Sequence, residues 1–288
     1  MSVRVFAPAK INLTLKVGRP RADGLHPLES MVAFADIGDI VTAESGDDLA
    51  LTIEGDFARD LAADDENLVL RAARALAQAA GVAAHARLTL EKNLPVASGV
   101  GGGSADAAAA LRALNQLWAL NWDGARLAKL GRTLGADVPV FFTSAGAAFM
   151  SGTGEVCSPA VAPPLAAVLV NPLAPLATAD VYRQFDRMSL GGALAGAGAP
   201  RWDSADAAIA GMRALGNDLE APAQALMPAI AAMLAELRAL PQVRHAALSG
   251  SGATVFALTD DWNGAETLAT ELIARHPDWW VSEAMLGA

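Results

Sequence analysis

The pattern of apolar and polar positions predicts strands in the first third of the chain. Residues 11–17, Ile-Asn-Leu-Thr-Leu-Lys-Val, alternate between the two classes with the period of a strand that buries one face. Residues 67–80 have the period of an amphipathic helix, which the pattern ends at Gly81. Further strands are predicted at residues 32–42, 49–53 and 87–92.

The rest of the chain alternates between helical and strand patterns, which makes the predicted fold class α+β. Residues 189–200 are rich in Gly and Ala and have no charge and no period, so a flexible loop is predicted there. We expect two subdomains around one cleft, residues 1–155 and residues 156–288. Helices are predicted at residues 105–120, 123–134, 179–187, 204–215, 221–240 and 263–275, and strands at residues 147–150, 166–171, 244–248, 254–258 and the C-terminus.

Composition excludes several classes of protein. The 288 residues carry a formal charge of −10, which argues against a general nucleic-acid binder but not against one small polyanionic ligand. A single Cys rules out an internal disulfide and fits a reducing cytoplasm. Residues 156–179 are uncharged but contain five prolines, which break any membrane helix. Pro8 and Lys10 interrupt the N-terminal apolar run that a signal peptide needs, so we expect a cytoplasmic protein with no membrane partner.

A glycine-rich segment carries the strongest chemical signal. Residues 94–106 read Leu-Pro-Val-Ala-Ser-Gly-Val-Gly-Gly-Gly-Ser-Ala-Asp and open a predicted helix. Glycines let the backbone approach a ligand closely, and a helix start offers unpaired N–H groups, so the segment is suited to phosphate. Ser104 or Asp106 could instead cap the helix, but a cap does not need four glycines. Gly-Lys-Ser/Thr is absent and Ser104 replaces the third glycine of the dinucleotide fingerprint, so neither common nucleotide motif is present.

Three further segments carry candidate chemistry, each with a plainer alternative. Asp137, in Gly-Ala-Asp-Val-Pro, could be a general base or could cap a turn. Lys10 could be catalytic, but by itself it is better interpreted as a solvated lysine at a strand end. Residues 248–256 contain Ser-Gly-Ser-Gly between strands, which a simple hairpin also explains. The four histidines lack metal-ligand spacing, and no serine lies in a Gly-x-Ser-x-Gly elbow.

Taken in order, these segments resemble the motifs of the GHMP kinase superfamily over residues 5–260. The resemblance implies a two-subdomain GHMP kinase fold with a nucleotide and substrate cleft, and an ATP-dependent small-molecule kinase. Residues 21–26, 134–141 and 217–218 resemble the branch that phosphorylates the 2-hydroxyl of a cytidine diphosphate ester of methylerythritol, giving ADP, in non-mevalonate isoprenoid biosynthesis. The expected partner is therefore a small cytidine diphosphate molecule, and the chain itself is expected to be a monomer or a weak homodimer.

The resemblance also implies the roles of individual residues. Asp137 matches the base that accepts the proton of the substrate hydroxyl, and Lys10 matches its partner. Ser104 is the side chain expected near Mg²⁺. The residues expected to hold the ATP phosphates are Pro95, Val96, Ala97, Ser98, Gly99, Val100, Gly101, Gly102, Gly103, Ser104 and Ala105.

The other end of the substrate would meet a second set of residues. By the same resemblance His26 hydrogen-bonds cytosine, Tyr182 stacks on it, and Asn12 lies beside the acceptor hydroxyl. Leu25 stands where the branch usually has Tyr, and Ala97 and Ser98 replace glycines of the phosphate loop. A homoserine or mevalonate kinase, a non-catalytic nucleotide-binding regulator and a structural interaction protein remain as alternatives.

Overall fold

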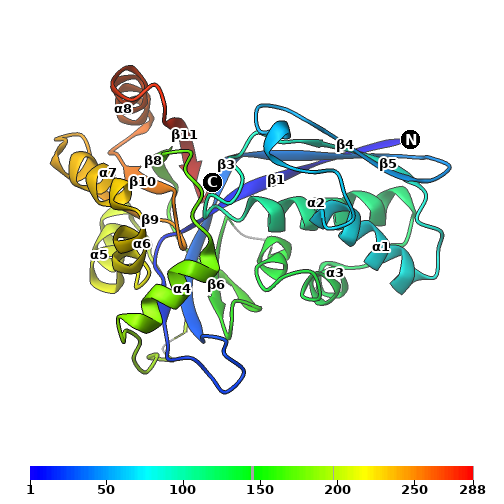
Figure 1. Cartoon of the computed structure of the whole chain (residues 1–288), viewed down its shortest axis with the longest axis horizontal. Coiled ribbons are helices and arrows are strands. Elements are labelled where there is room, and N and C mark those ends of the chain that lie inside the picture. The colour runs from blue at the N-terminus through cyan, green and yellow to red at the C-terminus, as the bar shows by residue number, and fades with distance from the viewer. Residues whose placement is uncertain (144–145, 197, 288) are drawn as a thin grey trace. The chain divides into compact units, whose positions relative to one another are not determined.

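The computed structural model describes residues 1–143, 146–196 and 198–287, which form two compact units (Figure 1). The first unit contains Met1–Ala9, Gly38–Val96 and Gly101–Ser144, and the second contains Lys10–Ile37, Ala97–Val100 and Ala145–Ala288. Helices and strands alternate in both units, so the predicted α+β class is confirmed. The expected subdomain boundary at residue 155 stays a prediction.

The first unit is a small sheet with helices packed against it. Strand β4 (Leu49–Glu54) pairs in parallel with β5 (Ala86–Glu91), and β5 pairs antiparallel with the last residues of β3 (Leu28–Glu44). Figure 1 shows the α-helices of this unit gathered on one side of these strands. Helix α1 packs against β4 and α2, and the set comprises α1 (Leu68–Ala80), α2 (Gly102–Leu117), α3 (Gly124–Gly131) and the 3₁₀ helices η1 (Ala58–Asp60) and η2 (Val138–Phe142).

Local sequence sets the ends of α1 where the pattern predicted them. The Asn67 side chain accepts a hydrogen bond from the N–H of Val69 at 3.0 Å, which satisfies a free donor of the first turn. Gly81 ends the helix with a φ of 69°, in the left-handed region that glycine adopts without strain. The apolar stripe between them is buried, so the predicted helix is confirmed.

The second unit is built on a sheet whose central strand is fully buried. Strand β8 (Leu165–Asn171) lies between β11 (Trp280–Leu286) and β10 (Val255–Leu258), all antiparallel, and β9 (His245–Leu248) follows β10. Helix α8 (Trp262–Arg275) covers β8 and β11, and α7 (Pro228–Ala239) covers β9 and β10. The remaining elements are β1 (Ser2–Asn12), β2 (Lys16–Val17), β6 (Ala147–Ser151), β7 (Val156–Ala160), α4 (Thr178–Arg187), α5 (Ala205–Leu215) and α6 (Glu220–Leu226).

Several predicted elements are wrong in extent. The strand predicted at residues 11–17 is interrupted, because β1 ends at Asn12 and the N–H groups of Leu13 and Thr14 both donate to the carbonyl of Met31. The helix predicted at residues 221–240 is two helices, since Pro228 has no N–H to continue the first and begins the second.

The five prolines of the uncharged residues 156–179 favour loops on both sides of the strand predicted at residues 166–171, and the first of these loops is wrong. Within residues 156–165 the structure has strand β7, which pairs only with β6, so Pro159 lies on an edge strand where a missing N–H is tolerated. Residues 189–196 and 198–200 contain no helix or strand, and Ala197 lies outside the described residues. No helix of the described ranges is both long enough and apolar enough to cross a membrane.

Candidate active site

Three segments that are distant in sequence meet in the second unit. The N–H of Lys10, near the end of β1, donates to the carbonyl of Val100 at 2.8 Å. The hydroxyl of Ser249 donates to the carbonyl of Gly99 at 3.1 Å and accepts from the N–H of Asn12 at 3.2 Å. The glycine-rich residues 97–100 are therefore held between β1 and the turn at residues 249–252, two of the other segments that the sequence singled out.

Gly99 is glycine because of the turn that it packs against. Its φ is 80°, and a Cβ built on it would lie 2.6 Å from the carbonyl oxygen of Gly252 and 2.8 Å from that of Ser249. No side chain fits at those distances, and the backbone conformation already disfavours one. The contact between the loop and the turn by itself requires a glycine here, and the close approach of a ligand to Gly99 stays a prediction.

The start of α2 is open for a ligand. Its N-cap is Gly101, with a φ of 70°, and no side chain caps the helix. Gly103 is exposed and Ser104 is half-buried, so the first turn is accessible. The alternative in which Ser104 or Asp106 merely caps this helix is therefore wrong. Uncapped N–H groups and the helix dipole together favour an anion at this position.

A buried ionic cluster, which the sequence analysis missed, anchors the approach to the glycine-rich segment. The Lys92 ammonium donates to one carboxylate oxygen of Asp39 and, at 3.1 Å, to Asp106. The other oxygen of Asp39 accepts from the N–H groups of Asn93 and Leu94 at 2.6 and 2.9 Å. The three charged side chains are each at most 3% exposed, so the cluster is locked within the first unit.

Burial also changes the ionisation of the cluster. It raises the pKa of Asp106 to about 8, an effect that Lys92 opposes and that the nearby Asp39 carboxylate reinforces. Burial thus favours the protonated form of Asp106 beside the Lys92–Asp39 ion pair. A Cβ on Gly102 would lie 3.0 Å from the Lys92 ammonium, so this glycine makes room for the cluster. The two charges that flank the glycines, Lys92 and Asp106, are the signal in the sequence that could have revealed it.

The two residues assigned to the chemistry lie in different units. Lys10, in the second unit, is only 4% exposed, so the interpretation of this residue as a solvated strand-end lysine is wrong. Asp137, in the first unit, is half-buried directly before η2, and its side chain makes no capping hydrogen bond to that helix. The plainer alternatives for both residues are thereby weakened, and their catalytic roles stay predictions.

Asn12 brings an uncommitted acceptor to the loop and turn. It is 5% exposed, its amide nitrogen donates to the hydroxyl of Ser30 at 2.7 Å, and its side-chain oxygen has no hydrogen-bond partner among the described residues. That oxygen would lie 3.2 Å from a Cβ at Gly250, so the turn passes directly over it. An unsatisfied buried carbonyl is costly unless a ligand or water donates to it.

His26 and Tyr182 lie together, as the expected roles require. Their ring centroids are 5.1 Å apart and the rings are tilted by 41°. His26 Nδ1 is 3.0 Å from the carbonyl of Gly18, and Nε2 is 3.4 Å from a carboxylate oxygen of Asp186. Because a carbonyl only accepts, the bond to Gly18 places a proton on Nδ1. Leu25 beside them is 52% exposed.

Comparison with known families identifies the fold. The model of the GHMP kinases N terminal domain matches residues 67–145, and the model of the GHMP kinases C terminal domain matches residues 193–278. The chain belongs to the GHMP kinase family. The resemblance on which the sequence analysis relied is confirmed, and so is the GHMP kinase fold.

Relatives within the GHMP kinases are similar over nearly their whole length. The chain is 48% identical to a 4-diphosphocytidyl-2-C-methyl-D-erythritol kinase of Xanthobacter autotrophicus, covering 99% of both chains. It is 47% identical to a relative of the same name in Hyphomonas neptunium, covering 100% of this chain and 97% of the relative. A crystal structure of 4-(cytidine 5'-diphospho)-2C-methyl-D-erythritol kinase superposes with a TM-score of 0.78 at 34% identity, covering 99% of each chain.

More distant GHMP kinases share the fold alone. A homoserine kinase from Cytophaga hutchinsonii has a TM-score of 0.70 at 18% identity, covering 100% of this chain and 94% of the other. A mevalonate kinase from L. major has a TM-score of 0.68 at 15% identity, covering 99% of this chain and 95% of the other. One scaffold thus serves different alcohols, and the substrate must be argued from the residues of the site.

Proposed function

We propose that this chain is an ATP-dependent kinase that phosphorylates the 2-hydroxyl of 4-diphosphocytidyl-2-C-methyl-D-erythritol, giving the 2-phosphate and ADP. The reaction belongs to the non-mevalonate formation of isoprenoid precursors. The observation that carries the proposal is the 44–48% identity, over nearly the whole chain, to relatives that bear this kinase's name. The distant homoserine and mevalonate kinases share the fold at 18% identity or less, which supports no choice of substrate.

The glycine-rich segment is proposed to hold the phosphates of ATP. The uncapped first turn of α2 offers N–H donors to an anion, and the exposed Gly103 leaves them accessible. The Ser104 hydroxyl would help to hold Mg²⁺, a cation that binds few protein ligands and relies on phosphate oxygens. Among the described residues, no group of three or more Asp, Glu, His or Cys side chains could hold a metal ion. Binding of Mg²⁺ through few protein ligands is consistent with that finding. When bound, Mg²⁺ neutralises charge on the transferring phosphoryl group.

Asp137 and Lys10 are proposed to act on the acceptor hydroxyl. Asp137 would accept its proton as the phosphoryl group arrives, and Lys10 would stabilise the carboxylate and the developing alkoxide. The 4% exposure of Lys10 supports this role, because a charge in a dry environment acts more strongly than one in water. The unpartnered oxygen of Asn12 is placed to accept a hydrogen bond from a hydroxyl of the substrate.

His26 and Tyr182 are proposed to select the cytosine. The bond of Nδ1 to the Gly18 carbonyl holds the His26 ring in place, and its Nε2 edge, which also faces Asp186 at 3.4 Å, would meet the polar edge of cytosine. Tyr182 provides an aromatic face 5.1 Å from the histidine ring, suited to stacking. Neither homoserine nor mevalonate has a base that would use this pair, so the pair favours a nucleotide ester over either alcohol.

A coupled assay of ADP release with three alcohols tests the proposal. The cytidine diphosphate ester should give a kcat/KM at least about 100-fold above those of homoserine and mevalonate, since the base contacts contribute only with the ester. Turnover of mevalonate or homoserine in preference to the ester would overturn the substrate assignment. ATP binding without turnover of any of the three would favour the regulator. The cytoplasmic location and the monomeric or weakly dimeric state remain predictions from sequence.

A further inference from the structure

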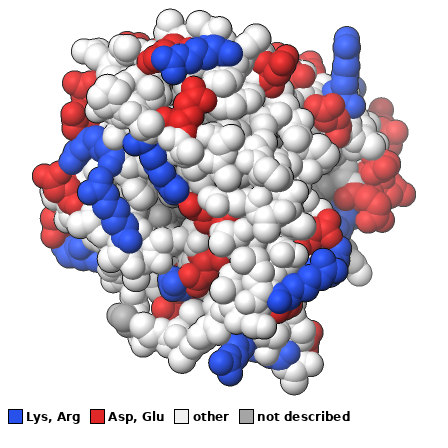
Figure 2. All heavy atoms as spheres, turned by 60° about the vertical axis from the view of Figure 1, so that its left-hand side comes forward, with Lys and Arg blue, Asp and Glu red and all other residues white. Residues whose placement is uncertain are grey.

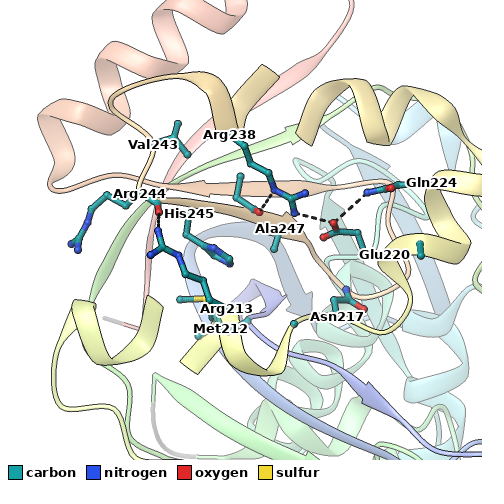
Figure 3. A pocket seen from close by; sticks show the side chains of 14 residues that line it. Met212, Arg213, Asn217, Glu220, Gln224, Arg238, Val243, Arg244, His245 and Ala247 are labelled. Atoms are coloured by element: carbon teal, nitrogen blue, oxygen red, sulfur yellow. Dashed lines mark hydrogen bonds and ion pairs between the residues drawn. The ribbon is translucent and has the colours of Figure 1, made fainter. Parts of the chain in front are cut away.

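A cavity in the second unit lies outside every residue assigned to the kinase reaction. It measures about 680 Å³, and its walls come from α5, α6, α7 and β9 (Figure 3). That volume exceeds what a lone inorganic anion needs and falls within the range of small-molecule sites. On the face shown in Figure 2, basic and acidic side chains lie side by side around a hollow.

The charged lining of the cavity is predominantly positive. Arg213, Arg238 and Arg244 line it, against one acidic side chain in the described lining, Glu220. Arg238 is paired with Glu220 at 2.9 Å, and Arg244 is bound by two carboxylates, Asp206 and Asp260. Among the residues that the structure describes, Arg213 has no acidic partner, and its guanidinium donates to the carbonyl of Arg244 at 2.6 Å. The named arginines and carboxylates balance in charge, and Arg213 is the arginine of this lining that no carboxylate contacts among the described residues.

His245 adds an unsatisfied polar group beside that charge. Its Nε2 is buried and has no hydrogen-bond partner in the part of the chain that the structure describes. In Figure 3 its ring lies next to Arg213, between the side chains of α5 and the strand β9. Burial, reinforced by Arg213 and Arg238, lowers the pKa of His245 to about 4, so the ring is neutral and offers one N–H donor. Two further groups face this histidine or its cavity. Glu220 is the acidic side chain of the described lining, and the ring of Phe256 packs edge-on against the ring of His245.

We propose that this cavity binds a small organic phosphate, a phosphomonoester or diphosphate ester with a short apolar body. The phosphate would bind the guanidinium of Arg213, which lacks an acidic partner among the described residues, and accept a hydrogen bond from His245, as both groups are donors placed side by side. The apolar body would pack on the uncharged part of the wall, which includes Leu13, Met212 and Val243. None of the residues proposed to bind ATP, Mg²⁺ or the substrate lines this cavity, although Asn217 of its wall bonds the carbonyl of Gly250 in the turn of the candidate active site. Either assignment can therefore fail without the other.

Histidine NMR on the full chain tests this proposal directly. The chain has four histidines, and the signal of His245 is assigned as the one lost in His245→Gln. Titration with butyl phosphate at neutral pH should shift this signal to saturation and raise the pKa of His245, because the anion offsets the neighbouring arginines. Butanol, the matched neutral probe, should leave the signal unchanged. An unchanged His245 signal at 10 mM butyl phosphate, or an equal response to butanol, overturns the proposal.

Two arginine variants separate this cavity from any other phosphate site of the chain. Arg213→Gln should weaken the binding seen at His245 by about tenfold or more, since it removes a charge-assisted hydrogen bond. Arg201→Gln, which changes an exposed arginine paired with Asp203 in the same unit, should leave the binding unchanged. Equal affinity in Arg213→Gln and the native chain overturns the assignment of the phosphate to Arg213. The titration of the native chain decides the proposal even where an arginine variant fails to fold.

Discussion

Replacement of Gly99 by alanine tests whether the contact between loop and turn organises the phosphate site. An added Cβ would lie 2.6 Å from the carbonyl oxygen of Gly252, while ordinary van der Waals contact begins near 3.4 Å, so the loop or the turn must move by about 0.8 Å. The positive φ of 80° adds a conformational cost of about 1–2 kcal/mol for any residue with a Cβ. Because overpacking adds to this conformational cost, we expect Gly99→Ala to lose about 2–4 kcal/mol of unfolding free energy.

Gly24 offers a matched control for that experiment. Its φ is 79°, nearly that of Gly99, and an added Cβ would meet nothing within 4 Å. Gly24→Ala therefore carries the conformational cost without the clash, and we expect a loss of about 1 kcal/mol. The difference between the two variants in urea unfolding isolates the contact with the turn.

Kinetics extend the same test from stability to function. A displacement approaching 1 Å in a positioning segment can reduce turnover by up to about 100-fold, so Gly99→Ala should raise the KM for ATP and lower kcat at temperatures where it is folded. Gly24→Ala should keep the KM for ATP within about twofold of the native value. Equal unfolding free energies for the two variants, or native ATP kinetics in Gly99→Ala, would refute the reasoning.

The remaining predictions concern the chemistry, the specificity and the pH dependence. Asp137→Asn should keep its affinity for ATP and lose about 10²- to 10⁴-fold in kcat, and native turnover would exclude Asp137 as the base. Tyr182→Ala should raise the KM for the cytidine diphosphate ester far more than that for ATP, and equal changes would contradict the stacking role. The lowered pKa of His245 means that the unfolded chain binds a proton between about pH 6.5 and 4 that the folded chain does not. Stability should therefore fall as the pH falls through that range, by about 1–2 kcal/mol after allowance for the partial exposure of the ring, and chemical unfolding of His245→Gln should lack this component.

Local signals in the sequence predicted those elements whose ends are set by a few neighbouring residues. Helix α1 is the best example, because an asparagine cap and a left-handed glycine mark its two ends in the sequence itself. The same signals failed where an element depends on distant partners. The alternation of residues 11–17 continues past the end of β1, and only the bonds of Leu13 and Thr14 to Met31 end the strand.

The site was predictable as motifs but not as contacts. The segments around Lys10, Gly99 and Ser249 were each recognisable, yet the bonds that join them link residues up to 237 positions apart. The contact of Gly99 with the turn was therefore not foreseen, and its expected contact with ATP stays a prediction. The cluster of Lys92, Asp39 and Asp106 was missed for the same reason, since its charges become a unit only when the fold buries them together.

Phosphorus NMR of the reaction product tests the proposed reaction most directly. The 2-carbon of a 2-C-methylerythritol chain carries no hydrogen, so a phosphate ester at the 2-hydroxyl has no proton three bonds from its phosphorus. With the native chain, ATP and the cytidine diphosphate ester, we predict one new monoester signal that stays a singlet without proton decoupling, formed in equal amount to ADP. A doublet or triplet would place the phosphate on another hydroxyl, and ADP formed without any new ester would contradict phosphoryl transfer to this substrate.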